Sequence, residues 1–242
     1  MKKRQVYLFF NIFFAVFFAS CTGFFDLGEE KIVSLSPANQ QSKTLIYFTN
    51  SNNYAVDIFS SPTRGIKVVS VSANQSTQAI SWIPTNDGFE FYFTYNLLVS
   101  GNKVPYIPRK YGVDFITVGI PKDKTTQIQV PKLSDIIPVN DKLFDDAYLA
   151  IKNNNASAIQ LLSGSSVELP VTGLSLVNYG ETALYKLNTT NVSLYSIKIQ
   201  GNTVNLSSEI TELQSGYLYE VEVKAGTGIS LSGSKPLTLE NL

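Results

Sequence analysis

Two residue types, cysteine and histidine, limit the chemistry available to this chain. Cys21 is the only cysteine among the 242 residues, and histidine is absent from the sequence. A Ser-His-Asp triad, a Cys-His pair and a histidine-based zinc site all need residues that this chain lacks. A single thiol also has no partner for a disulfide within the chain. The sequence therefore excludes these three kinds of site and favours a non-catalytic protein without a metal or a cofactor. The question becomes what Cys21 does.

The cysteine ends an apolar N-terminal segment. Residues 2–4 are basic, and residues 6–19 are apolar except for one asparagine. This apolar run is shorter than the roughly 20 residues that a membrane-spanning helix needs. Ala19 and Ser20 supply the small side chains of a signal-processing site. Residues 1–20 are therefore predicted to be a signal peptide.

The segment Phe18-Ala19-Ser20-Cys21 resembles the lipobox of bacterial lipoproteins, in which small residues precede a cysteine. In that family the cysteine is diacylated on sulfur, with chains such as palmitate, and becomes the new N-terminus. The resemblance implies that Cys21 is lipidated and anchors the protein in the bacterial cell envelope.

The family usually has Leu where this chain has Phe18, and relaxed lipoboxes of this kind occur in spirochaete lipoproteins. Thr22 replaces the aspartate that retains enteric lipoproteins at the inner membrane, which favours the outer membrane or a periplasm-facing leaflet. Two alternatives stay open, a secretory signal followed by an unmodified cysteine and an uncleaved N-terminal anchor.

The composition is that of a folded, exported protein. Three of the 19 basic residues lie in the signal, which leaves 16 basic against 19 acidic residues and a net charge of about −3. No basic patch is present, so nucleic acid is not a predicted partner. The hydrophobic fraction of 44% is sufficient for a buried core. Residues 21–43 are predicted to be the lipid-anchor cysteine and a tether.

From residue 44 to residue 133, short β-rich runs alternate with turn residues, which predicts an antiparallel β-sandwich module. The runs at 45–48 and 54–59 flank an Asn-rich segment and are predicted to form a hairpin. A second strand pair is predicted from the runs at 116–120 and 126–130. Residues 104–110 contain two prolines and should form a loop or an edge strand.

Four residues of this module are candidates for ligand binding. Residues 89–95 alternate, so that Phe89, Phe91, Phe93 and Tyr95 should face the core while Tyr92 lies on the other face. Tyr92 is the best candidate for an exposed ring. Tyr106, Arg109 and Tyr111 form a mixed aromatic and basic loop of a kind that suits contact with a protein or glycan ligand. The alternative is that these side chains only pack the sheet or cover its end.

Residues 134–146 are interpreted as an interdomain linker, and their four acidic residues as its solvated face. A calcium site formed by Asp141, Asp145 and Asp146 is a less favoured alternative, because the spacing does not match an EF-hand loop.

Residues 147–242 are predicted to form a second β-sandwich module that repeats the first. Residues 48–60 align with 151–163 at an offset of 103, and residues 74–80 align with 178–184 at 104. We interpret this as an internal duplication of a β module of about 100 residues. The alternative is a chance similarity between two Asn- and Ser-rich segments.

The sequence thus predicts an all-β protein of two tandem antiparallel β-sandwich-like (immunoglobulin-like) modules behind a signal peptide and a tether. The predicted function is non-catalytic binding or adhesion at the cell envelope through loops of the β modules. One alternative is a structural subunit of an envelope assembly that uses edge-strand pairing. A less favoured alternative is a hydrolase that uses two carboxylates.

Overall fold

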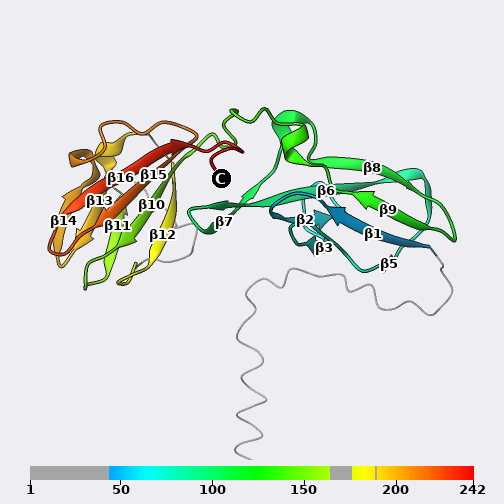
Figure 1. Cartoon of the computed structure of the whole chain (residues 1–242), viewed down its shortest axis with the longest axis horizontal. Coiled ribbons are helices and arrows are strands. Elements are labelled where there is room, and N and C mark those ends of the chain that lie inside the picture. The colour runs from blue at the N-terminus through cyan, green and yellow to red at the C-terminus, as the bar shows by residue number, and fades with distance from the viewer. Residues whose placement is uncertain (1–43, 164–175, 189) are drawn as a thin grey trace, which may run out of the picture.

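The computed structural model describes residues 44–163, 176–188 and 190–242, and these residues form two β-sandwich modules that lie end to end (Figure 1). The prediction of an all-β protein is confirmed, since the helical elements of the described residues are single 3-10 turns. Within these ranges no helix is long and apolar enough to cross a membrane. The signal peptide, Cys21 and the predicted tether lie outside the described residues.

Module 1 consists of two sheets that enclose an aromatic-rich core. Its strands are β1 (Leu45–Asn50), β2 (Ala55–Phe59), β3 (Lys67–Val71), β4 (Gln75–Ser76), β5 (Ile80–Ser81), β6 (Thr85–Val99), β7 (Asn102–Tyr106), β8 (Phe115–Ile120) and β9 (Thr125–Gln129). The β1 sheet places β1 between β9 and the short strands β4 and β5, and the β6 sheet has the order β3-β2-β6, with β7 and β8 both pairing with β6. The predicted inward face of β6 is confirmed, because Phe91, Phe93 and Tyr95 are fully buried.

Module 2 has the same two-sheet design. Its strands are β10 (Ala147–Asn153), β11 (Ile159–Ser163), β12 (Thr182–Leu187), β13 (Tyr195–Ile199), β14 (Asn202–Asn205), β15 (Tyr217–Val223) and β16 (Ile229–Pro236). One sheet has the order β12-β10-β15-β16, and the other has the order β11-β13-β14. The core between them is formed by apolar side chains such as Leu149, Ile151, Tyr195 and Val221.

Two of the predicted strand pairs are wrong. β1 and β2 do not form a hairpin, because β1 belongs to one sheet and β2 to the other, and β8 and β9 are separated in the same way. Each connection is therefore an arch that crosses the sandwich, so both flanking strands bury their inward residues in one core. The pairing is also not purely antiparallel, since β1 pairs in parallel with β9 and β10 with β15.

The arch between β1 and β2 is closed by two buried asparagines. Asn50 and Asn52 are 1% and 2% exposed. The Asn50 side-chain nitrogen donates to the carbonyl oxygens of three residues: Tyr54 at 2.9 Å, Val71 at 3.2 Å and Ser72 at 3.0 Å. The Asn50 side-chain oxygen accepts from the Asn52 backbone N–H, and the Asn52 amide donates to the Pro131 carbonyl at 3.0 Å. The pair therefore joins the arch to β3 and to the end of β9.

Module 2 repeats this arrangement at the residues that the sequence repeat predicts. Asn153, 103 positions after Asn50, donates to the carbonyls of Ser157 at 2.9 Å and Val177 at 2.8 Å. The Asn155 N–H donates to the Asn153 side-chain oxygen, and the Asn155 amide reaches the Lys224 carbonyl after β15 at 3.0 Å. The internal repeat therefore extends to individual hydrogen bonds.

The second block of the repeat is displaced from the predicted alignment. In module 1, Thr49 pairs with Ser76. Lys152 is the residue of module 2 that is equivalent to Thr49, and it pairs with Thr182. Ser76 and Thr182 are thus equivalent at an offset of 106, not 104. The change in offset arises before Val71 and Val177, because these two carbonyls accept from the equivalent amides of Asn50 and Asn153 and are already 106 positions apart. Linear matching of turn residues cannot register such a change.

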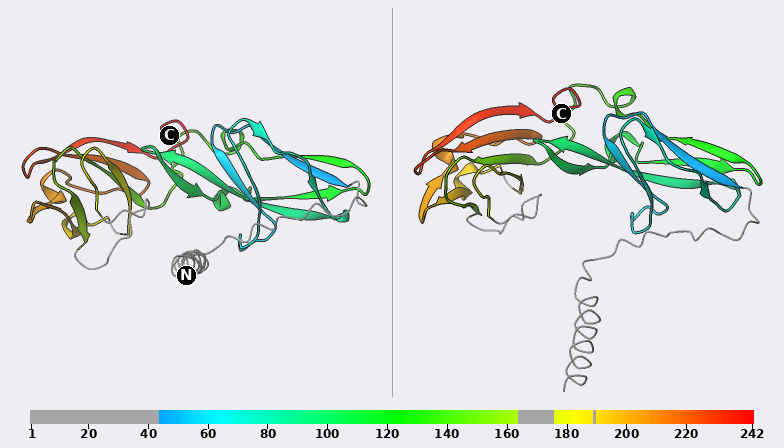
Figure 2. Two further views of the ribbon diagram at one scale, coloured as in Figure 1. Left: turned by 90° about the horizontal axis from the view of Figure 1, so that it is seen from below. Right: turned by 60° about the horizontal axis from the view of Figure 1, so that its bottom comes forward.

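The two modules are joined by an apolar contact. Val99 and Val104 of the β6–β7 hairpin share a buried cluster with residues of module 2, namely Tyr148, Ala150, Leu184, Leu218 and Leu237. From the linker, Phe144 places its ring 5.5 Å from Tyr106 and 5.1 Å from Tyr148. The views in Figures 1 and 2 show the C-terminal segment at this junction, in the middle of the molecule.

The linker is packed on its apolar side and solvated on its acidic side. Ile137 and Leu143 belong to the core cluster of module 1. Asp135 and Asp145 are exposed. The remaining two acids face different lysines, because Asp141 lies 3.9 Å from Lys110 and Asp146 lies 2.7 Å from Lys186. The candidate calcium ligands thus do not converge on one point.

We expect Asn153→Ala to lower the free energy of unfolding by about 1–3 kcal/mol, because buried carbonyls lose their donor. The matched substitution Asn50→Ala should have an effect of similar size in module 1. The control Asn53→Ala removes an exposed amide from the same arch and should stay within about 0.5 kcal/mol of the parent. Urea unfolding of the protein from residue 22 onward measures the free energy of unfolding of all three variants. Equal stability of the parent and Asn153→Ala would contradict the role of the buried amides.

Candidate ligand-binding site on the outer face of module 1

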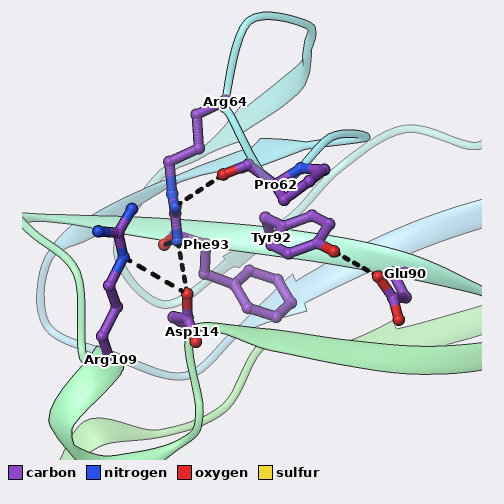
Figure 3. A network of polar contacts seen from close by, with 7 residues as sticks. All are labelled: Pro62, Arg64, Glu90, Tyr92, Phe93, Arg109 and Asp114. Carbon is purple, nitrogen blue, oxygen red and sulfur yellow. Dashed lines mark hydrogen bonds and ion pairs between the residues drawn. The ribbon is translucent and has the colours of Figure 1, made fainter.

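The structure separates the four predicted binding residues. Tyr106 is 6% exposed and packs against Phe144 at the module junction. Tyr111 donates its hydroxyl to the Asp141 carboxylate at 2.9 Å, so its polar end is bound to the linker. Arg109, on the 3-10 turn Arg109–Tyr111, keeps 69% of its side chain exposed. Tyr92 lies on the outward face of β6, in the same polar network as Arg109 (Figure 3).

The expectation of an exposed Tyr92 ring is wrong. The ring is on the predicted face but is only 9% exposed, because the β2–β3 loop covers it (Figure 3). The Arg64 guanidinium lies 5.9 Å from the ring centroid, within the range of a cation–π contact. The Tyr92 hydroxyl donates to the Glu90 carboxylate, and this hydrogen bond raises the pKa of Tyr92 above its ordinary value.

Arg64 holds the covering loop in place. Its backbone has a φ of 57°, in the left-handed region, which costs a non-glycine residue about 1–2 kcal/mol. Its guanidinium, with the side chain 10% exposed, donates to the Pro62 carbonyl at 3.3 Å, the Phe93 carbonyl at 3.3 Å and the Asp114 carboxylate at 3.1 Å. These bonds tie the loop to β6 and to the start of β8.

Three aromatic residues form a row across the outer face. Phe59 of β2 pairs with Tyr92 of β6, which in turn pairs with Phe115 of β8. The first two rings are 8% and 9% exposed, whereas Phe115 is 40% exposed. The rings of Tyr92 and Phe115 are 5.5 Å apart. The row therefore ends at the accessible ring of Phe115 on the edge strand β8, and this ring packs beside the buried ring of Tyr92.

A nearly free guanidinium accompanies this ring. Asp114, which precedes Phe115, is already bound by Arg64, and Arg109 approaches the same carboxylate only through its Nε at 4.0 Å. Among the described residues, no acceptor lies within hydrogen-bonding distance of the Arg109 terminal nitrogens. We call Tyr92, Phe115, Arg64, Asp114 and Arg109 the outer-face site.

Sequence reasoning identified two of these five residues, Tyr92 and Arg109. It missed Arg64, Asp114 and Phe115 because their association joins strands and loops up to 50 positions apart. The turn at 62–65 was predicted, but nothing in its composition indicates which sheet face it covers.

A polar strip continues the same face beyond the aromatic row. Asp57 pairs with Thr94 on β6 and accepts hydrogen bonds from Asn96 at 3.0 Å and Ser70 at 2.5 Å. Lys67 lies 2.9 Å from this carboxylate. Partial burial by itself raises the pKa of Asp57, but these hydrogen bonds and the charge of Lys67 together lower it below its ordinary value.

The arrangement offers binding chemistry: an aromatic surface, a guanidinium and nearby hydroxyl and carboxylate groups. Within the described ranges, no group of three or more acidic side chains could hold a metal ion. Asp114 of the outer-face site is paired with Arg64, and the neighbouring Glu90 accepts a hydrogen bond from Tyr92.

Comparisons with known proteins give fold likenesses at low similarity. No family model matches the chain, and no curated protein matches it. One similar solved structure is a candidate cell adhesion protein from Bacteroides ovatus, at 10% identity and a TM-score of 0.32, with 81% of this chain and 98% of that chain covered. A second, from Bacteroides uniformis and described in the same words, has 12% identity and a TM-score of 0.30, with 81% and 99% covered.

A third similar structure is the tip fimbrial protein Mfa3 from Porphyromonas gingivalis with a C-terminal truncation. It has 12% identity and a TM-score of 0.26, with 80% of this chain and 98% of that chain covered. Likenesses of this size leave the assignment of function to the residues of the chain itself.

We expect the Asp57 carboxylate to make the stability of module 1 sensitive to acid. Because its folded pKa lies below the ordinary value of 3.8, its stabilising contribution is complete above that value and is lost as the pH falls through the folded pKa. Asp57→Asn should therefore unfold with a shallower pH dependence below about pH 4 than the parent. Thermal unfolding between neutral and acidic pH measures the difference, and parallel curves for the two proteins would contradict it.

Proposed function

We propose that this chain is a lipid-anchored protein of the bacterial cell envelope with a non-catalytic, adhesion-type binding role. The observation that carries the binding role is the outer-face site, where the accessible Phe115 ring lies beside the exposed Arg109 guanidinium. Ligand contacts are often dominated by aromatic and arginine side chains on a rigid support. The support here is the β6 sheet, on which the Tyr92 ring packs beside Phe115 at 5.5 Å.

The anchoring half of the proposal is supported by Cys21 and the residues before it. A single acyl chain holds a protein at a membrane only weakly, whereas two or more chains give a stable anchor. An anchored protein needs no enzymatic activity to be useful, because its position already places a binding surface at the envelope. The ligand would be a protein or a glycan that reaches this surface.

The binding role is tested with soluble protein from residue 22 onward on arrays of glycans and matrix proteins. For any ligand found, Phe115→Ala should weaken binding by about 2 kcal/mol, as for a central aromatic contact. The control Leu98→Ala removes an apolar side chain that is 52% exposed elsewhere on β6, and its affinity should equal that of the parent. Undiminished binding by Phe115→Ala would contradict this site.

If the soluble chain binds nothing and instead self-associates in light scattering, the alternative of an envelope assembly would replace the binding role. β8 and β9 are edge strands of module 1 and would be the first candidates for such pairing.

The anchor is tested by the intact mass of protein purified from its native cells. We expect a chain that begins at Cys21 and carries added acyl mass, and we expect Cys21→Ala to lack that mass and to leave the membrane fraction. An unmodified mass that Cys21→Ala does not change would remove the anchor from the proposal.

A further inference from the structure

The end of module 1 at which β1 begins is the end to which any N-terminal anchor is joined. Thr44, the first described residue, accepts a hydrogen bond from the Trp82 backbone N–H at 3.1 Å. Its hydroxyl accepts one from the Asp123 N–H at 2.8 Å. In Figures 1 and 2 this end is the outer tip of module 1, opposite to the junction with module 2.

This tip carries the most exposed large apolar side chain among those of the described residues. Ile83 is 77% exposed, and it stands between Trp82 and the exposed Pro84. The Trp82 ring is fixed from the core side, 5.2 Å from the Phe89 ring and 5.3 Å from the Phe91 ring. We call Trp82, Ile83 and Pro84 the tip patch. A single exposed isoleucine is ordinary on a protein surface, but here it adjoins a tryptophan at the point of chain entry.

The charges around the tip patch cancel. Lys122 and Lys124 lie in the turn that holds Thr44, and Asp123 lies between them. Asp87, which is also exposed, follows the tip patch at the start of β6. Two cations and two carboxylates give the tip no net charge, so net charge does not attract the tip to a charged surface.

We propose that the tip patch rests on the surface of the bilayer in which Cys21 is anchored. This inference builds on the anchor proposed above. The 22 residues between Cys21 and Thr44 reach at most roughly 75 Å, so the tip is confined near the lipid surface. Because the tether keeps the tip close to the bilayer, the effective concentration of lipid at the tip is high. An apolar contact that is too weak to bind the untethered protein to a membrane can then form. Tryptophan with a neighbouring apolar side chain suits the interfacial region of a membrane.

The contact would also set the orientation of the molecule relative to the bilayer. Because module 2 lies at the opposite end of the molecule from the tip (Figure 1), module 2 would be held away from the bilayer. The occupant that we propose for the tip patch is lipid and not a second protein, because the chain enters module 1 beside this patch.

Trp82 is the only tryptophan in the chain, so its fluorescence reports on the tip alone. The mature chain is coupled through the Cys21 thiol to a maleimide phospholipid in phosphatidylcholine vesicles, with or without brominated acyl chains. Bromine quenches tryptophan only at close range, so we expect a loss of Trp82 emission in the brominated vesicles. The loss should persist at high salt, because the tip has no net charge.

Ile83→Asp should abolish this loss, since a charged side chain resists contact with lipid. The matched control Leu98→Asp makes the same kind of change at an exposed residue near the module junction, and it should quench like the parent. Undiminished emission of the parent in brominated vesicles, or equal quenching of Ile83→Asp, would overturn the contact. Chemical coupling keeps this result separate from native acylation, which the mass measurement tests independently.

Discussion

The sandwich of each module depends on a buried pair of asparagine side chains at the first arch. When a chain leaves one sheet and enters the other, the carbonyls beside the crossing have no ladder partner, and burying them unpaired is costly. Asn50 and Asn153 supply donors to these carbonyls, and their side-chain oxygens accept the N–H two residues later. An amide can do both at once because it carries a donor and an acceptor on one short side chain. Side-chain amides of the protein itself thus pair with the backbone groups at the crossing.

The outer face of the β6 sheet, which points away from the core, also carries packed side chains. Arg64 covers Tyr92 and pairs with Asp114, so a charged side chain shields an aromatic row that would otherwise be exposed. The terminal nitrogens of this buried guanidinium donate to a carboxylate and two carbonyls, whereas its Nε has no hydrogen-bond partner among the described residues. This cover stops at the edge strand, where Phe115 and Arg109 stay accessible. The same contacts that stabilise the face therefore also define the part of it that can bind.

The elongated arrangement gives the two ends of the molecule different surroundings. The junction buries Val104 and Leu218 in one cluster, and Phe144 packs between a ring of each module, so an apolar contact joins the two modules. The opposite tip carries Trp82 and Ile83 beside the point where the chain enters β1. The proposed lipid anchor and the proposed contact of the tip with the bilayer would leave the outer-face site free to bind a ligand.

The sequence alone determined the all-β class, the inward face of β6 and the 103-residue repeat, because these follow from the period of two and from the order of turn residues. The Asn-rich segment after residue 48 was correctly predicted to turn the chain, but the connection was predicted to be a hairpin and is an arch. Local turn chemistry does not reveal whether the two flanking strands pair with each other or belong to different sheets. Tyr92 was assigned to the correct face and wrongly expected to be exposed. Its burial depends on Arg64 and Asp114, which the tertiary structure brings together from separate loops, and no local pattern encodes such a contact.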